Sequence, residues 1–337
     1  MLSDVKEYYG LARDLGKSGY FETAQSQQTF KELRLAIKDR KLVALSGIVG
    51  SGKSTTLQRI QDTLIQEKEI LVAKFLAIEK SKINLTTLMM ALFLDLATDK
   101  DGRMPTQTER RERALLELIR KRHKPIALFI DEAHDLHGKT LVGLKRLIEV
   151  VRSGGGTLSV VLAGHPKLKN DLSRPSMEEI GARATMFNLE PFGPERLKYI
   201  HWLIGQAVAP KVKIDALITA EALALLSERL TTPLQFEQYL TRAFEEAYKI
   251  AQKPVGTDIV ESVLAPDIDA LDARLVRNGY NVKNLCDLLN SKPREINAFI
   301  RGQLPPECTQ QLSSRSPSAC RCSGFRSVIR FQTREHQ

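Results

Sequence analysis

The segment "LVALSGIVGSGKST", residues 42–55, constrains the fold more than any other part of the chain. A short apolar run leads into a glycine-rich turn, and a helix-forming segment follows at once. Gly47, Gly52, Lys53 and Ser54 reproduce the spacing G-x-x-x-x-G-K-[ST] of a Walker A motif. Glycines let successive backbone N–H groups surround a phosphate, and the N-terminus of the following helix favours the same negative charge. The stretch therefore predicts a buried strand, a phosphate-binding loop and a helix.

Each position of this loop has an expected role. Lys53 is expected to reach the β- and γ-phosphates of a nucleotide, and the Ser54 hydroxyl to ligate Mg²⁺. The residues expected to contact the nucleotide are Gly47, Gly50, Ser51, Gly52, Lys53, Ser54, Thr55 and Asp131.

A second motif follows in "PIALFIDEAHDL", residues 125–136. Its apolar residues predict a buried strand that delivers Asp131 to the end of a sheet, where the carboxylate joins Ser54 as a Mg²⁺ ligand. Glu132, one residue further, is placed to polarise an attacking water. The two motifs together predict a nucleoside triphosphatase that uses ATP and Mg²⁺.

The letters Asp-Glu-Ala-His also give the DEAH-box helicases their name. Such a helicase needs two tandem RecA-like domains, and the pattern after residue 191 is helical only. We therefore exclude a helicase, and His134 is expected to be an ordinary loop or supporting residue.

Strand and helix patterns alternate between residues 41 and 191, which predicts an α/β fold with a parallel sheet covered by helices on both faces. The predicted divisions are an N-terminal helical segment 1–40, a nucleotide-binding α/β domain 41–191, a helical lid 192–265, a C-terminal helical pair 266–304 and a disordered tail 305–337.

The chain resembles the AAA+ ATPases over roughly residues 15–265. "YFETAQSQQTFKELRLAIKDRKLVALSGIVGSGKSTTL", "ALFIDEAHDL" and "VVLAGHPKL" are similar to the group that contains ExeA-type ATPases and the transposon ATPases of the TnsC, TniB and MuB type. The resemblance implies ATP-bound ring or helical oligomers on double-stranded DNA that present a target to a transposase and its target-selection proteins. It also implies that His165 is the sensor 1 residue; the alternative is a strand-end histidine that caps the next turn.

By the same resemblance, an arginine from a neighbouring subunit completes the catalytic site. Arg183 is the first candidate and Arg174 the second, although either could be a surface ion-pair residue instead. Related lids often carry Gly-x-Pro-Arg, whose arginine serves as sensor 2, whereas here Leu234 follows Pro233. This departure predicts slow hydrolysis.

The chain has 50 lysines and arginines against 40 acidic residues, a balance that suits a polyanionic partner such as DNA. "RKRHK", residues 120–124, and "HPKLKND" could follow phosphates without regard to sequence, although solvated helix faces explain them equally well. The segment "VKNLCDLLNSKPREINAFIRGQL" has the length of a helix-turn-helix, with Arg294, Asn297 and Arg301 on its second helix. A small helical bundle that extends the lid or docks a partner is the open alternative.

The remaining features bound the protein's class. No apolar run is long enough for a membrane span and the first twenty residues lack a signal pattern, so we expect a cytoplasmic bacterial protein without membrane partners. Cys286, Cys308, Cys320 and Cys322 lack the paired spacing of a zinc site. The rival functions are an ExeA-like secretion-assembly ATPase, whose membrane and peptidoglycan-binding regions are not seen here, and a protein-directed AAA+ switch that does not bind DNA.

Overall fold

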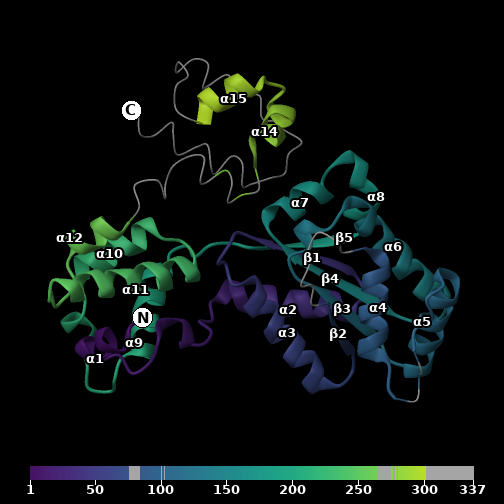
Figure 1. Ribbon diagram of the computed structural model, residues 1–337, viewed down its shortest axis with the longest axis horizontal. Coiled ribbons are helices and arrows are strands. Elements are labelled where there is room, and N and C mark those ends of the chain that lie inside the picture. The colour runs from purple at the N-terminus through teal and green to yellow at the C-terminus, as the bar shows by residue number, and fades with distance from the viewer. Residues whose placement is uncertain are drawn as a thin grey trace. The chain divides into compact units, whose positions relative to one another are not determined.

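The computed structural model describes residues 1–75, 84–99, 101, 103–264, 275, 278 and 280–300 (Figure 1). They belong to two compact units, one of residues 20–191 and one that joins residues 1–19 to the chain from Phe192 onward. The expected N-terminal segment 1–40 is thus divided between the units, because its two helices pack on different cores. The expected tail 305–337, with Cys308, Cys320 and Cys322, lies outside the described residues, as does Arg301.

The unit of residues 20–191 is built on a parallel five-stranded sheet in the order β2-β3-β4-β1-β5. This confirms the predicted α/β fold. The strands are β1 (Leu42–Gly47), β2 (Leu71–Phe75), β3 (Ile126–Ile130), β4 (Leu158–Gly164) and β5 (Ala184–Leu189). Because the strands are parallel, the segments that follow β3, β4 and β1 all begin at the same edge of the sheet, and the strand order makes these segments neighbours there.

Alternating side chains of the central strands enter two separate cores. On β3, Leu128 packs with the cluster on one face of the sheet, and Phe129 packs with the cluster on the other. The same alternation holds on β4 for Val160 and Val161. Burial on both faces explains why these strands are continuous apolar runs in the sequence.

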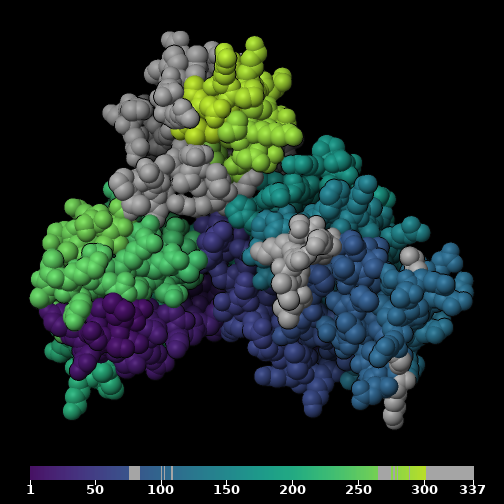
Figure 2. Space-filling model, viewed as in Figure 1, coloured from purple at the N-terminus to yellow at the C-terminus, as the bar shows by residue number. Residues whose placement is uncertain are grey.

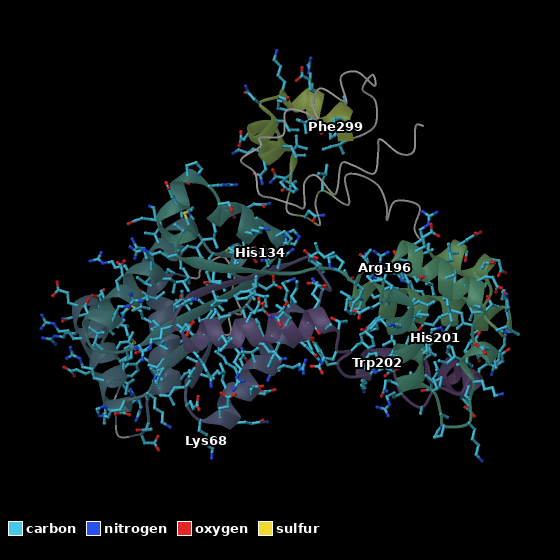
Figure 3. All side chains as sticks on the ribbon, turned by 180° about the vertical axis from the view of Figure 1, so that it is seen from behind. Lys68, His134, Arg196, His201, Trp202 and Phe299 are labelled. Carbon is cyan, nitrogen blue, oxygen red and sulfur yellow. The ribbon has the colours of Figure 1, made fainter. Side chains whose placement is uncertain are left out.

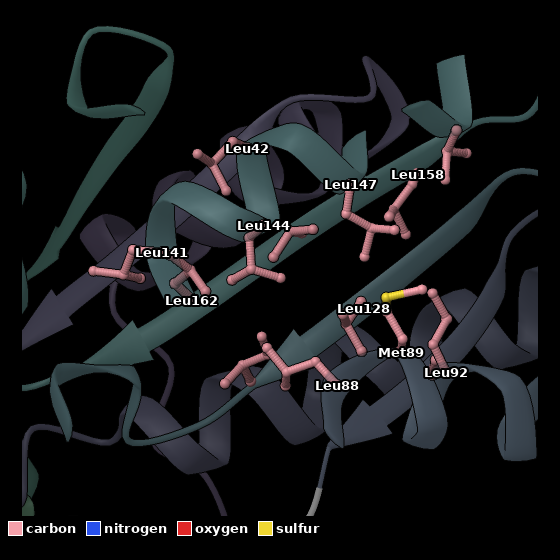
Figure 4. Packing of buried hydrophobic residues seen from close by; sticks show 14 of the residues in the cluster. Leu42, Leu88, Met89, Leu92, Leu128, Leu141, Leu144, Leu147, Leu158 and Leu162 are labelled. Carbon is pink, nitrogen blue, oxygen red and sulfur yellow. The ribbon is translucent and has the colours of Figure 1, made fainter. Parts of the chain in front are cut away.

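Helices cover both faces of the sheet. One face carries α2 (Ala24–Lys38) and α3 (Lys53–Glu67). The other carries α4 (Leu85–Leu96), α5 (Thr108–Arg122), α6 (Gly138–Ser153), α7 (Pro166–Leu172) and α8 (Glu178–Gly181), with the short turns η3 (Ala133–Asp135) and η4 (Pro175–Met177). Figure 4 shows leucines of α4 and α6 packed against those of the strands.

The second unit is helical. It contains α1 (Ser3–Tyr9), η1 (Leu15–Lys17), α9 (Arg196–Ala207), η5 (Ile214–Ala216), α10 (Ala220–Arg229), α11 (Pro233–Lys249) and α12 (Thr257–Val263). Figure 2 shows the N-terminal residues, in purple, packed directly against the green helices of this unit. Tyr9 anchors them: its ring lies 4.9 Å from that of Phe244, and its hydroxyl donates to the Gln252 carbonyl at 2.7 Å.

A short helix pair, α14 (Val282–Leu289) and α15 (Pro293–Ile300), has a small core of its own. Phe299, labelled in Figure 3, is buried in it together with Leu275, Tyr280, Leu285, Leu289 and Ile296. Among the described residues, no helix is both long and apolar enough to cross a membrane.

Candidate functional site

The loop between β1 and α3 has the backbone of a phosphate cradle. Gly50 and Gly52 have φ angles of +78° and +92°, which side chains rarely permit. A Cβ on Gly47 would lie 2.6 Å from Ser51 Oγ and 3.0 Å from the Leu189 carbonyl oxygen. The Ser51 hydroxyl is buried and has no hydrogen-bond partner within the described part of the chain. A buried hydroxyl in that state fits a loop that closes on a polar ligand.

Lys53 begins α3 and turns its side chain back into this loop. The residue is buried, and its ammonium donates to the carbonyl oxygens of Gly47 at 2.9 Å and Ile48 at 3.0 Å. Burial lowers the pKa of Lys53, while the charges of Glu132 and Asp131 act in the opposite direction. The fold thus holds the partly desolvated Lys53 ammonium beside the loop, and an anion bound there would offset the free energy of burying this charge.

Ser54 and Asp131 meet across the sheet edge. The Ser54 hydroxyl donates to Asp131 Oδ2 at 2.9 Å, and Asp131 Oδ1 accepts the backbone N–H of Glu132 at 2.8 Å. The pair presents hard oxygen ligands of the kind that Mg²⁺ prefers. Thr55 lies on the same first turn of α3 and is exposed.

Glu132 follows Asp131 in an unusual backbone conformation. Its φ and ψ angles are 53° and 34°, in the left-handed region that non-glycine residues seldom adopt. This bend directs the chain into η3 and brings His134 back toward the sheet. The Glu132 carboxylate oxygen Oε2 lies 3.2 Å from His134 Nδ1.

His165 follows β4, and its ring centroid lies 5.7 Å from that of His134. Its side chain caps α7, because Nδ1 accepts the backbone N–H of Lys167 at 3.4 Å. This is the geometry of the alternative role considered for His165, and it still leaves the imidazole at the edge of the sheet that carries Asp131.

The two arginine candidates form ion pairs within the α/β unit. Arg183 pairs with Glu149, and Arg174 lies 3.0 Å from Asp171. Both arginine side chains are more than half exposed, at 57% and 52%.

The basic run of residues 120–124 has structural partners. Lys121 and Arg122 bind the carboxylate of Asp101, and Lys124 donates to the Lys68 carbonyl at 3.0 Å. These contacts close the C-terminal end of α5, so the run is less free to follow a DNA backbone than its sequence indicates.

The turn of the α14–α15 pair contains a left-handed residue at its first position. Asn290 has φ 47° and ψ 51°, and its backbone N–H bonds the Cys286 carbonyl at the end of α14. Asparagine tolerates this conformation better than most residues, so it takes the place of the glycine that the sequence lacks. Arg294 and Asn297 are exposed on α15.

The residues at this edge of the sheet fit a nucleoside triphosphate and its cation. The glycine loop and Lys53 suit phosphate oxygens, Ser54 and Asp131 suit Mg²⁺, and Glu132 is a carboxylate available to a water. The contact of His134 with the end of β4 could not be predicted from the sequence, because it depends on which strands are neighbours and no local spacing encodes it.

Comparison with known proteins agrees with this fold. A family model described as an AAA domain matches residues 35–172. The structure of Cdc6p from Pyrobaculum aerophilum is similar, with a TM-score of 0.56, 13% identity and 98% of each chain covered. The structure of Drosophila ORC bound to DNA gives a TM-score of 0.51 at 16% identity, covering 98% of this chain and 90% of that one.

A third similar structure is the Aeropyrum pernix ORC1 protein in complex with DNA, with a TM-score of 0.50, 14% identity, and 98% of this chain and 86% of that one covered. No curated protein sequence matches the chain. Residues 35–172 of the α/β unit are therefore similar to an AAA domain, and the unit has the AAA+ fold.

Proposed function

We propose that this chain is an ATP-dependent, oligomerising AAA+ regulator of DNA transposition, which binds double-stranded DNA and recruits or activates a transposase there. The observation that carries the ATP-dependent part is the meeting of Ser54 and Asp131 at 2.9 Å beside the buried Lys53. A carboxylate, a hydroxyl and an ammonium from two separate sequence motifs converge at one edge of the sheet, as nucleotide hydrolysis requires.

The chain's own residues divide the chemistry among them. Backbone N–H groups of the glycine loop and Lys53 would bind the phosphates, and Ser54 with Asp131 would hold Mg²⁺, which supplies electrostatic stabilisation to the phosphates when bound. Glu132 would orient a water and accept its proton.

We infer that hydrolysis is slow. Leu234 stands near the start of α11, where related lids often carry an arginine, and Arg196 on α9 is engaged in other contacts. Its guanidinium donates to the carbonyls of Phe192 at 2.7 Å and Ser227 at 3.3 Å. A slow ATPase suits a protein whose ATP-bound state is the one that acts.

The proposal that the protein forms oligomers rests on the proposed role of Arg183 as the catalytic arginine of a neighbouring subunit's site. Arg183 is exposed and pairs with Glu149 on the surface of its own unit. Exposed ion pairs contribute only about 0–1 kcal/mol, so Arg183 can exchange Glu149 for a neighbour's nucleotide at little cost. Arg174 remains the second candidate.

The α14–α15 pair supports DNA as the partner. Its two helices are joined by the three residues 290–292, and apolar side chains at Leu285, Leu289, Ile296 and Phe299 hold them together. The exposed side of α15 carries Arg294 and Asn297, residue types that contact phosphates and base edges. Two of the structures with a similar fold, those of Drosophila ORC and Aeropyrum pernix ORC1, contain DNA.

The transposition part of the proposal is supported by the motifs "FIDEAHDL" and "LAGHPKL", which resemble those of transposon ATPases. The transposase and target-selection proteins would be its protein partners.

Electron microscopy of the purified protein with duplex DNA tests the proposal, in the presence of a non-hydrolysable ATP analogue, ADP or no nucleotide. Regular rings or filaments on DNA only with the analogue are expected. A variant with Arg294, Asn297 and the exposed Lys292 of the preceding turn all replaced by alanine should bind DNA more weakly. A protein that oligomerises with the analogue but ignores DNA would instead be a protein-directed switch.

A further inference from the structure

The imidazole of His134 lies between two groups that require opposite hydrogen-bonding roles of the same ring nitrogen. Its Nδ1 lies 3.2 Å from Glu132 Oε2 and 3.3 Å from the backbone N of His165. A carboxylate can only accept a hydrogen bond and a backbone N–H can only donate one. In any one state of the ring, Nδ1 therefore serves Glu132 as a donor or His165 as an acceptor, but not both.

The other ring nitrogen, Nε2, faces a second carboxylate. Nε2 of His134 lies 3.6 Å from Asp135 Oδ1. With the proton on Nε2, the ring faces Asp135 as a donor and accepts from His165 through Nδ1. With the proton on Nδ1, the ring donates to Glu132 and releases the N–H of His165.

The end of β4 is shaped to hold the ring in this place. A Cβ on Gly164 would lie 3.0 Å from the backbone N of His134 and 3.3 Å from its Nδ1, so glycine permits the approach. Lys167 makes a further contact with this residue, because its ammonium donates a hydrogen bond to the His134 carbonyl at 3.1 Å. The His134 side chain is 20% exposed, and Figure 3 labels it in the α/β unit.

We propose that His134 is the positioning residue of Glu132 in ATP hydrolysis: its Nδ1 holds the Glu132 carboxylate when it donates, and frees it when it turns to the N–H of His165. This inference rests on the proposed ATPase function. This exchange couples the orientation of the Glu132 carboxylate, after β3, to the position of His165, the residue that follows β4. β4 lies between β3 and the strand β1 that precedes the nucleotide loop, so this contact lies at the same edge of the sheet as the proposed phosphate site.

Substitutions at His134 separate positioning from packing. The terminal amide of asparagine lies near the place of Nδ1, whereas the longer glutamine carries its amide toward the place of Nε2. His134→Asn should therefore keep hydrolysis near the wild-type rate, and His134→Gln and His134→Ala should lower kcat about ten-fold or more, the loss expected for one hydrogen bond to a charged group. KM and the affinity for the ATP analogue should stay unchanged in all three variants.

The matched control is His137→Ala. His137 lies on the same loop and caps α6 by accepting the N–H of Lys139 at 3.2 Å. Its removal should leave kcat unchanged. Rates are measured on the full chain with and without duplex DNA, beside unfolding temperatures and nucleotide affinities that identify any variant with a folding defect.

Equal losses of kcat in His134→Asn and His134→Gln, or no loss in His134→Ala, would overturn the positioning role. Glu132→Gln in the same assay distinguishes this from failure of the proposed function. If the wild-type rate exceeds that of Glu132→Gln, the ATPase stands and the His134 series decides the inference alone. If the two rates are equally absent, the ATPase proposal falls and the inference falls with it.

Discussion

The hydroxyl of Ser54, on the first turn of α3, donates a hydrogen bond of 2.9 Å to Asp131 at the end of β3. The two residues are far apart in the sequence, and β4 lies between their strands. Two motifs that are each generic by themselves therefore form one site.

Replacing Ser54 by alanine removes one of the two proposed oxygen ligands of Mg²⁺. We expect Ser54→Ala to weaken Mg²⁺-dependent ATP binding about ten-fold, and to affect binding without Mg²⁺ much less. Titration calorimetry with and without Mg²⁺ measures both. Thr63→Ala is the control, because this hydroxyl of the same helix donates to the Arg59 carbonyl instead. Equal effects of the two substitutions would argue against the metal role.

Lys53→Met should abolish ATP binding without destabilising the nucleotide-free protein. Burial holds the pKa of Lys53 below its ordinary value of 10.5, so the unfolded chain binds this proton more tightly than the folded protein does. The resulting penalty is full below the lowered pKa and disappears as pH rises toward 10.5.

Methionine carries no charge, so the nucleotide-free variant should unfold at the wild-type temperature or above it at neutral pH. Magnesium ATP should raise the unfolding temperature of the wild type only. A variant that unfolds at a clearly lower temperature would mean that the hydrogen bonds to Gly47 and Ile48 outweigh the desolvation of the ammonium.

Arg183→Ala should lose hydrolysis by at least about ten-fold while it still binds ATP, because the proposed role of the arginine is to act on a neighbour's nucleotide. Mixing this variant with Glu132→Gln should restore part of the rate, since one class of mixed interface then has both groups intact. Arg174→Ala is the companion measurement. If only Arg174→Ala shows this complementation, the second candidate is the catalytic arginine.

Asp101→Asn should lower the unfolding temperature at neutral pH. Lys121, Thr98 and Arg122 all donate to the Asp101 carboxylate and hold its pKa well below the ordinary 3.8. A lowered carboxyl pKa contributes stability above its unfolded value, and this stability is lost as pH falls from there through the folded pKa.

The difference between wild type and Asp101→Asn should therefore be constant near neutrality and shrink below pH 3.8. Thermal unfolding over a pH series measures it. Asp62→Asn serves as the control, because Asp62 accepts from Gln58 on the exposed face of α3. A gap that persists at low pH would show that the carboxylate charge is not its source.

Asn290→Val should loosen the α14–α15 turn, since a β-branched residue in the left-handed region costs about 1–2 kcal/mol. Asn290→Gly should keep the turn, because glycine adopts this conformation freely. Hydrogen exchange of the α14 and α15 amides in the full chain measures the loosening, and duplex DNA affinity should fall with it for valine only. Unchanged exchange in Asn290→Val would contradict the role assigned to this turn.

Several features could be predicted from the sequence because they are local. The glycine loop, the helix that begins at Lys53 and the order of Asp131 and Glu132 at a strand end each depend on neighbours along the chain. The alternation of buried side chains on β3 and β4 likewise appears as apolar runs, because a strand covered on both faces needs apolar residues at every position.

Only the tertiary structure decided which of these local features meet. The packing of residues 1–19 on the helices that follow Phe192 depends on a core shared by opposite ends of the chain. The approach of His134 to His165 depends on β3 and β4 being neighbours and on Gly164 leaving room at the end of β4. Strand order follows from the burial of whole helix and sheet faces, so the sequence motifs supply the chemical groups and the packing determines which of them come into contact.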